Sequence, residues 1–363
     1  ISEEEQELRS NADIQSIIVG EDTLTKVENQ DYDYTITIPN TSNPIINVIP
    51  VNSLSNVEIT KDNTNIVNGT NINPVIGENI YNVKVISADK SNTNKVKVLV
   101  KYIKTEKVSI FGKTYNALDT NPTLTTSSNN TNDLNGLYKS TATNTGKSTY
   151  YFRGNVEDNY VSFAGQTWRI VRVNEDGTIR MIMQDGINNN TAYKFNSNYK
   201  NYTYMYYSNS QAKTTLESWY QTNIGNNEQY SKYVASGDYY CEQAKTIVDS
   251  SWSAGSATMT VYSNYMPDFK CTTDANTKGF INSSVGLITY DELVRAGAYL
   301  GQKNDNYYLY NKYDIWTMSP AGYKDSHSTA AVWCVYTTGS IGEDYRAVYT
   351  LHTLRPIINI KSD

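Results

Sequence analysis

The chain has 363 residues and a net charge of −6, with hydrophobic and charged fractions of 39% and 19%. Both fractions are below the globular average, and the length predicts two domains rather than one. The negative charge and the lack of a Lys/Arg stripe argue against a nucleic-acid partner, and the longest apolar runs, such as Ile45–Pro50, are too short to span a membrane.

Tyrosine is unusually frequent, with 32 Tyr against 6 Phe. A buried Tyr hydroxyl needs a hydrogen-bond partner, so a chain that used rings only in its core would contain more Phe. The surplus therefore indicates half-exposed rings, as in antibody-like binding surfaces. The codon bias of an AT-rich genome explains the same surplus without a binding role.

Residues 1–12 are acidic and polar, and they predict a linker or a frayed helix. From Asp13 to Lys104, short runs with alternating apolar residues follow one another, as in Tyr32–Ile38 and Val96–Tyr102. Turn signals such as Asn68-Gly69 separate them. The pattern predicts an antiparallel β-sandwich of roughly 90 residues.

This segment resembles the bacterial cadherin-like β-sandwich domain. The resemblance rests on the run Tyr32–Pro39, the run Val75–Ile86 with its Gly-Glu-Asn sequence, and a closing strand that ends in Tyr102. It implies a spacer or stalk module of an exported protein.

Residues 105–149 are predicted to be a linker with entry strands, because Val108–Phe111 has a strand pattern and Asn121–Asp133 has the composition of a loop. Since no signal peptide is visible at Ile1, the sequence is interpreted as a mature or trimmed ectodomain.

Residues 150–363 combine helix and strand patterns. Two alternating runs within Trp168–Met183, joined by a Gly-containing turn, predict a β-hairpin. Helices are predicted at Gln211–Thr222 and at Asp291–Gly297, the second capped by Thr289 or Asp291. Strands return at Ala331–Lys361, so the sequence predicts an α+β domain after an all-β sandwich. The Tyr-rich run at 199–207 is interpreted either as a stacking platform or as an insert packed on the flank of the domain.

Four runs of this domain, Asn159–Ile182, Val285–Tyr299, Ile315–Gly322 and Leu354–Ile360, resemble a bacterial C-type-lectin-like domain. That fold is shared with formylglycine-generating enzymes and with the variable proteins of diversity-generating retroelements. In the variable proteins, scattered codons near the C-terminus are diversified on a rigid scaffold, and the matching segment here is Trp316–Arg355.

The resemblance implies scaffold positions at Trp316, Ser319, Pro320, Val332, Trp333, Gly339, Leu354, Arg355 and Pro356. It implies ligand-contact positions between them at Tyr323, Lys324, Asp325, His327, Tyr336, Asp344, Tyr345, Arg346, Tyr349, Leu351 and His352. Both histidines of the chain and Cys334 fall in this segment, as random codon replacement would produce. An invariant lectin-like surface domain without a retroelement is the alternative.

Three cysteines are an odd number, which in an exported protein indicates one disulfide and one leftover thiol. The expected pair is Cys241 and Cys271, because it closes a loop of moderate length and contributes about 3 kcal/mol. Three reduced thiols in a cytosolic protein are the alternative.

The expected function is that of a secreted or cell-surface adhesin that recognises a protein or glycan on another cell, a phage or a host surface. Tyr and Arg side chains dominate binding hot spots. The alternative is a structural or pilus-like subunit. No catalytic residue, metal or cofactor is expected, because the two histidines lie 25 positions apart and match no ligand spacing. Cys334 also lacks the neighbouring cysteine that formylglycine-generating enzymes use.

Overall fold

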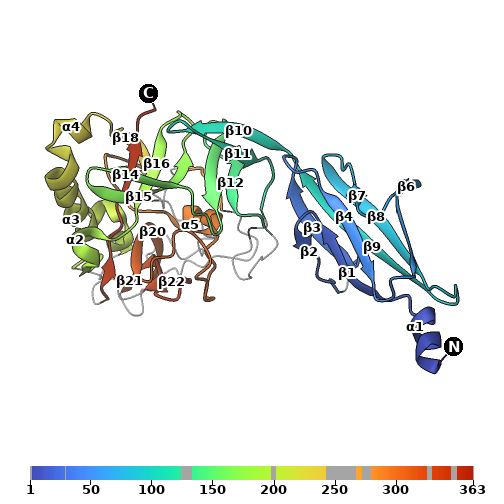
Figure 1. Ribbon diagram of the computed structural model, residues 1–363. Coiled ribbons are helices and arrows are strands. Elements are labelled where there is room, and N and C mark those ends of the chain that lie inside the picture. Colours follow the sequence, from blue (N-terminus) through green and yellow to red (C-terminus); the bar gives the residue numbers. More distant parts are fainter. Residues whose placement is uncertain are drawn as a thin grey trace. The chain divides into compact units, whose positions relative to one another are not determined.

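The computed structural model describes residues 2–28, 30–122, 124, 133–197, 202–242, 267–271, 279–324, 329–344 and 350–362. The chain forms two compact units (Figure 1). Unit 1 comprises Ile1–Glu106 and Leu118–Thr120, and unit 2 comprises Lys107–Ala117 and Asn121–Asp363. Unit 1 thus ends close to the predicted boundary at Lys104, whereas unit 2 includes residues that were predicted to be a linker.

Unit 1 begins with a short helix, α1 (Glu3–Ser10). Ser2 and Glu5 form a capping box, in which each side chain accepts a hydrogen bond from the backbone N–H of the other residue. Three glutamates in the first turn also favour the helix, because negative charge stabilises a helix N-terminus. Of the two predicted alternatives, the structure has the helix.

Two sheets form the rest of unit 1. In spatial order, the first contains β2 (Asp22–Thr23), β1 (Ile14–Val19), β4 (Ile45–Pro50) and β7 (Thr70–Asn71). The second contains β3 (Tyr34–Pro39), β9 (Thr93–Ile103), β8 (Gly77–Ile86), β5 (Asn56–Lys61) and β6 (Thr64–Ile66). Buried side chains from both sheets, such as Ile17 and Val83, form a single core, as the alternating patterns predicted.

The sequence predicted a purely antiparallel sandwich, and this prediction is wrong in one place. β3 pairs with β9 in parallel, with Tyr34 opposite Val98 and Pro39 opposite Ile103. The chain leaves the first sheet after β2 and crosses to the second sheet, so β3 enters beside β9 in the same direction. Alternation within a strand gives no information on the direction of its neighbour, which is why the pattern missed this pairing.

The larger sheet of unit 2 has eight strands. Its order is β10 (Thr105–Ile110), β11 (Lys113–Leu118), β12 (Gly136–Ser140), β13 (Thr149–Arg153), β15 (Gln166–Val173), β16 (Ile179–Met183) and β24 (Ile357–Ile360), with β14 (Tyr160–Phe163) also paired to β15. The predicted hairpin is confirmed as the β15–β16 pair. The strands β10 to β13 come from the predicted linker and its edge, so unit 2 starts well before residue 150.

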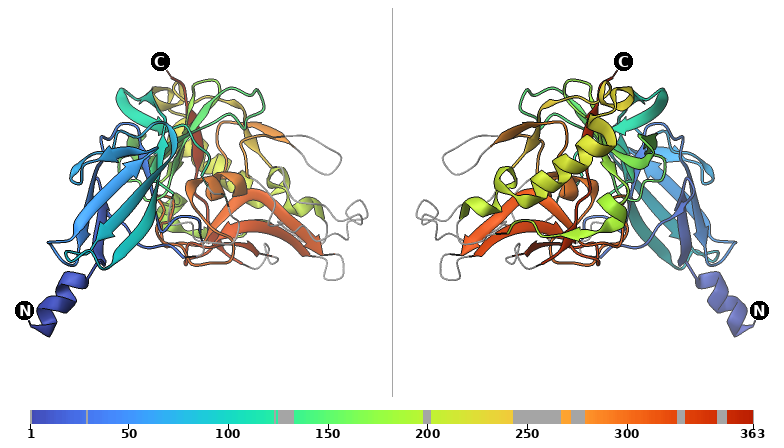
Figure 2. Two further views of the ribbon diagram at one scale, coloured as in Figure 1. Left: turned by 90° about the vertical axis from the view of Figure 1, so that its right-hand side faces the viewer. Right: turned by 90° about the vertical axis from the view of Figure 1, so that its left-hand side faces the viewer.

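The smaller sheet has five strands, in the order β17 (Ala192–Tyr193), β23 (His352–Thr353), β20 (Ile315–Lys324), β21 (Thr329–Val335) and β22 (Ile341–Asp344) (Figure 2). A separate pair contains β18 (Gly237–Cys241) and β19 (Phe280–Ser283). The helical elements are α2 (Ile187–Asn190), η1 (Tyr202–Met205), η2 (Tyr207–Asn209), α3 (Gln211–Tyr220), the π-helical turn η3 (Gln221–Gly225), α4 (Glu228–Ser231) and α5 (Tyr290–Ala296). Both predicted helices are present, as α3 with η3 and as α5.

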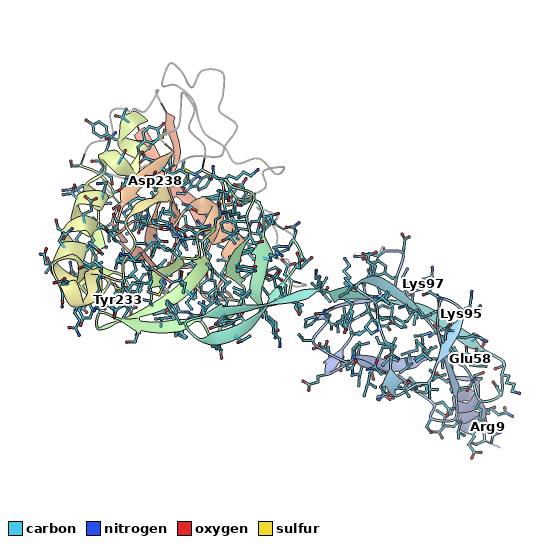
Figure 3. All side chains as sticks on the ribbon, turned by 90° about the horizontal axis from the view of Figure 1, so that it is seen from above. Arg9, Glu58, Lys95, Lys97, Tyr233 and Asp238 are labelled. Atoms are coloured by element: carbon cyan, nitrogen blue, oxygen red, sulfur yellow. A yellow bond between two sulfur atoms is a disulfide. The ribbon has the colours of Figure 1, made fainter. Side chains whose placement is uncertain are left out.

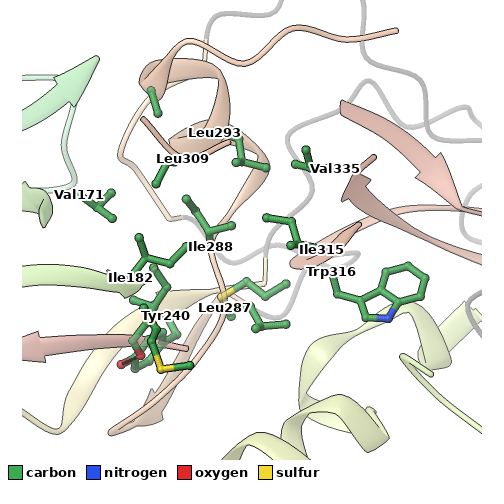
Figure 4. Close-up of a cluster of buried hydrophobic side chains, with 14 of the residues drawn as sticks. Val171, Ile182, Tyr240, Leu287, Ile288, Leu293, Leu309, Ile315, Trp316 and Val335 are labelled. Atoms are coloured by element: carbon green, nitrogen blue, oxygen red, sulfur yellow. Dashed lines mark hydrogen bonds between the residues drawn. The ribbon is translucent and has the colours of Figure 1, made fainter. Parts of the chain in front are cut away.

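One hydrophobic core joins the two sheets of unit 2 (Figure 4). Val171 and Ile182 approach it from the larger sheet, Leu293 from α5, and Ile315 and Val335 from the smaller sheet. Because the core is continuous, the smaller sheet is supported by the rest of the unit.

Many tyrosines are buried, against the expectation of half-exposed rings. Buried tyrosines are Tyr81, Tyr115, Tyr138, Tyr151, Tyr206, Tyr207, Tyr220, Tyr240, Tyr290, Tyr299, Tyr307 and Tyr308. The hydroxyls of Tyr138 and Tyr240 donate to the backbone carbonyls of Leu134 and Ile357, at 2.6 and 3.0 Å. Burial raises the pKa of Tyr81 to about 12. Much of the Tyr surplus therefore serves the core. In the run at 199–207, Tyr206 and Tyr207 pack inside the unit, as the flank interpretation predicted.

Candidate ligand-binding site

The smaller sheet of unit 2 carries the segment Trp316–Arg355. β21 is antiparallel to both β20 and β22, so β20 and β22 run in the same direction. Both strands therefore run toward the end of the sheet where β21 begins, here called the loop end. Lys324 lies opposite Thr329, the first residue of β21, and Asp344 lies opposite Val332, three residues further along. The opposite end, where β20 begins at Ile315, is called the base.

Buried contacts hold β20 at the base. The Nε1 of Trp316 donates to the carbonyl oxygen of Tyr193 at 2.8 Å, and its ring meets the edge of Phe195 with 5.5 Å between centroids. Next along the strand, the hydroxyl of Thr317 donates to the carbonyl oxygen of Trp333 in β21 at 2.7 Å. Directional contacts of this kind fix one register of the hairpin.

The Ser319-Pro320 pair connects β20 to helix α5. Ser319 Oγ accepts a hydrogen bond at 2.9 Å from the backbone N–H of Tyr290, the first residue of the helix. Thr289 caps the same helix, because its side chain accepts from the N–H of Glu292, whose carboxylate accepts from the N–H of Thr289. Pro320 lies at an irregularity in the β20–β21 register, as expected of a residue without an N–H.

A buried ion cluster supports α5 from the larger sheet. The carboxylate of Glu292 lies 2.6 Å from Arg180 Nε and 3.4 Å from Arg172 Nε. Burial alone raises the pKa of a carboxyl group, but the charges of Arg180 and Arg172 outweigh it and hold the pKa of Glu292 below its usual value. Burial lowers the pKa of Arg172 to about 10, against the opposing charge of Glu292. The charged form of each group in the cluster is therefore stabilised by the opposite charge of its neighbours.

The end of the segment is tied to the larger sheet by Arg355. Its Nε donates to the carbonyl oxygen of Met183 at 3.0 Å, and its guanidinium also donates to the carbonyl oxygen of Leu309. Burial lowers the pKa of Arg355 to about 10. All nine predicted scaffold positions are buried, namely Trp316, Ser319, Pro320, Val332, Trp333, Gly339, Leu354, Arg355 and Pro356.

Three predicted contact residues, Tyr323, Lys324 and Asp344, belong to the strand ends at the loop end. Asp325, His327, Tyr345, Arg346 and Tyr349 lie outside the described residues. In sequence, Asp325 and His327 belong to the connection that follows β20, and Tyr345, Arg346 and Tyr349 belong to the connection between β22 and β23.

The other three predicted contact residues are at the base. Tyr336 directly follows β21, and Leu351 and His352 precede the pairing of Thr353 with Ile315. The ten residues of β20 span roughly 30 Å of extended chain. The predicted contact residues therefore do not form one surface, because they divide between opposite ends of the sheet.

The prediction that His352 contacts a ligand is also wrong. Its side chain is only 2% exposed, and its ring lies 4.1 Å from the ring of Trp316 between centroids. Its Nδ1 is 3.8 Å from a carboxylate oxygen of Asp314. This histidine is a core residue of the base, whereas the neighbouring Leu351 is 51% exposed.

The disulfide between Cys241 and Cys271 is present, as predicted, and links two residues 30 positions apart. Cys334 is buried and lies outside this disulfide, and its thiol donates to the carbonyl oxygen of Gly342 in β22. It therefore faces the interior of the sheet and does not serve as a contact residue.

Within the described parts of the chain, no three His, Cys, Asp or Glu side chains converge in a way that would hold a metal ion. No helix among those residues is both long and apolar enough to cross a membrane.

Comparisons with protein-family models, with curated proteins and with solved structures find no match to this chain.

Proposed function

We propose that the chain is a binding protein and that the loop end of the smaller sheet in unit 2 is its recognition surface. The contact residues of this proposal are Tyr323, Lys324 and Asp344, with Asp325, His327, Tyr345, Arg346 and Tyr349 in the two connections that follow β20 and β22. The target is a protein or glycan on another cell, a phage or a host surface. The lectin-like resemblance and diversification by a retroelement stay predictions within this proposal.

The observation that carries the proposal is the contrast along β20. Its first half is anchored through Trp316, Thr317 and Ser319, by hydrogen bonds to three other parts of unit 2. Its second half and β22 both run toward the loop end, on either side of β21, so the connections that follow these two strands leave the sheet toward the same end. Rigid support lowers the entropy lost on binding and lets loop side chains change without unfolding the core.

The same proposal places the protein outside the cytosol. The disulfide between Cys241 and Cys271 supports this, because disulfides persist in oxidising compartments and are rare in cytosolic proteins. Nothing in the arrangement of the described side chains requires catalysis, so the proposed activity is binding alone.

The test is a variant in which Tyr323, Tyr345 and Tyr349 are all changed to Ser. Binding of the full chain to a panel of immobilised glycans and to intact bacterial and host cells is measured alongside its melting temperature. We expect binding to at least one panel member to fall at least about tenfold, as for loss of hot-spot residues, while the melting temperature stays unchanged.

The matched control changes Tyr313 and Leu351 to Ser, because both are exposed and both lie at the base of the same sheet. This control should bind as the unchanged chain does. Equal loss in both variants, or unchanged binding in the triple variant, would contradict the proposal. Concentration-dependent polymerisation in place of target binding would favour the structural or pilus-like alternative.

A further inference from the structure

A groove of about 920 Å³ lies on the larger sheet of unit 2. Its floor is formed by the apolar residues Val173, Ile179 and Met181 of β15 and β16. One wall contains two hairpin turns, at Phe111-Gly112 and Phe163-Ala164, and the other wall contains residues of α4 and the residues after it. This volume is within the range of pockets that bind small molecules. We call it the aromatic groove.

Four aromatic rings line the walls. Phe163 and Tyr230 meet edge to face across the groove, with 5.8 Å between centroids. Phe111 and Tyr233 are more open, at 48% and 42% exposure, and Tyr233 lies at the surface in Figure 3. Exposed rings in the lining offer flat apolar faces to a ligand that enters the groove.

Phe111 is held in an unfavourable backbone conformation. Its φ is +49°, and Gly112 follows at +77°, the pattern of a tight hairpin turn in which Asn, Asp or Gly is preferred at the first position. A bulky side chain in this region costs about 1–2 kcal/mol. A large exposed ring at this position therefore lowers stability without packing in the core, and strain of this kind clusters at functional sites.

The charged side chains that line the groove, within the described residues, are Lys232 and Lys361, both cationic. Lys361 Nζ donates to the carbonyl oxygen of Lys232 at 2.9 Å, which keeps the two lysines adjacent. Lys232 Nζ lies 4.9 Å from the centroid of Tyr233. In a chain of net charge −6, this local positive charge selects for an anionic ligand.

The strands of the floor also restrict the class of ligand. β16 is paired on both sides, with β15 and with β24, and the outer edge of β24 is bridged by Val234 and Gly286. A peptide that lay over Val173, Ile179 and Met181 would therefore find no free strand edge in β15, β16 or β24 for its own N–H and C=O groups, which need partners when buried. A sugar chain needs only side-chain partners, and Ser162 and Gln229 line the groove.

We infer that the aromatic groove binds an acidic oligosaccharide. The C–H faces of the sugar rings pack against Phe111 and Tyr233, and the carboxylates pair with Lys232 and Lys361. The inference is independent of the proposed function, because the groove lies on the larger sheet and the loop end belongs to the smaller sheet. Unit 2 then carries two separate binding sites.

The experiment measures the affinity of the full chain for hexasaccharides of hyaluronan, polygalacturonate and alginate by isothermal titration calorimetry. The titrations are done in 50 mM and in 300 mM NaCl. Chitohexaose and an acidic octapeptide of Asp, Glu and Gly are the comparison ligands. We expect at least one acidic hexasaccharide to bind more tightly than both comparison ligands, and high salt to weaken it, because exposed charge pairs are screened.

Phe111→Asn is the most informative variant. It removes the ring and relieves the strained turn, so we expect at least fivefold weaker binding with an equal or higher melting temperature. Lys232→Gln with Lys361→Gln should weaken binding at least tenfold in 50 mM NaCl and remove the preference over chitohexaose. The control is Phe280→Ala, which removes another exposed Phe outside the groove and should leave binding unchanged.

The inference is overturned if none of the three acidic hexasaccharides binds, if the peptide or chitohexaose binds as tightly, or if the Phe111 and lysine variants bind like the unchanged chain. The triple Tyr variant at the loop end should keep full affinity for the hexasaccharide. If that variant alone lost it, the ligand would belong to the loop end and the groove would be refuted, whatever the outcome for the proposed function.

Discussion

A Cβ atom on Gly339 would lie 1.8 Å from the carbonyl oxygen of Asn304. Gly339 also has a φ of +78°, which L-residues with side chains rarely adopt. It lies in the turn between β21 and β22, and the N–H of Asn304 donates to the carbonyl oxygen of the nearby Thr338. The turn and the chain around Asn304 therefore fit together only when residue 339 has no side chain.

Gly339→Ala should destabilise unit 2 by about 3 kcal/mol or more, because the backbone strain adds to a clash with backbone atoms. Gly301→Ala is the matched control. Gly301 has a φ of +67° but no atom within 4 Å of its Cβ position, so the loss there should be about 1 kcal/mol. Urea unfolding of both variants measures the difference, and equal losses would show that the clash is relieved by movement.

Glu292→Gln should destabilise unit 2 by about 3–5 kcal/mol, because it removes the counter-charge of the buried Arg180 and of the partly buried Arg172. Glu217→Gln, which removes the surface ion pair with Lys213, should cost less than about 0.5 kcal/mol. The measurement is again urea unfolding at pH 7. A small effect of Glu292→Gln would mean that water reaches the two arginines.

The contribution of Glu292 to stability should also depend on pH. Because the pKa of Glu292 is lower in the folded chain than in the unfolded chain, its contribution is complete above about pH 4.3, the unfolded value. The contribution is lost as pH falls through the lower folded pKa. The difference in unfolding free energy between the unchanged chain and Glu292→Gln should stay constant from pH 7 to pH 5 and shrink below pH 4. A difference that grew in acid would contradict the assignment.

Replacing Cys241 and Cys271 by Ser should cost about 3–4 kcal/mol, because the disulfide closes a loop between residues 30 positions apart and so restricts the unfolded chain. Thermal unfolding of unit 2 with and without a reductant measures this effect. The reductant should destabilise the unchanged chain and leave the double variant unaffected. A reductant that acted equally on both would indicate that the stabilisation has another source.

The sequence predicted the parts of the fold that depend on local pattern. The β15–β16 hairpin follows from alternation around a Gly-containing turn, and the α5 helix follows from its capping residue Thr289. The parallel pairing of β3 with β9 was missed, because strand direction depends on the path of the chain between sheets. The strands from β10 to β13 were predicted as a linker and entry strands. They belong to the larger sheet because they pair with one another and, through β13, with β15.

The candidate site was predicted less well for a related reason. The nine scaffold positions came from the family resemblance and not from a residue pattern, and all of them are buried. The segment Trp316–Arg355, however, was treated as one surface, although the chain returns from the loop end to the base before His352. A histidine against Trp316 cannot be distinguished by residue type from one that faces solvent. The aromatic groove had only one sequence signal, an aromatic residue directly before the turn glycine at Phe111-Gly112.

The last strand, β24, pairs with β16, so residues near 180 acquire their neighbours only from residues near 360. A ribosome must therefore release Ile360 before unit 2 can close, whereas every strand of unit 1 is available about 250 residues earlier. The larger sheet of unit 2 therefore stays open beside β16 until the C-terminal strand is in place. That order makes the second unit the part whose folding depends on protection from aggregation.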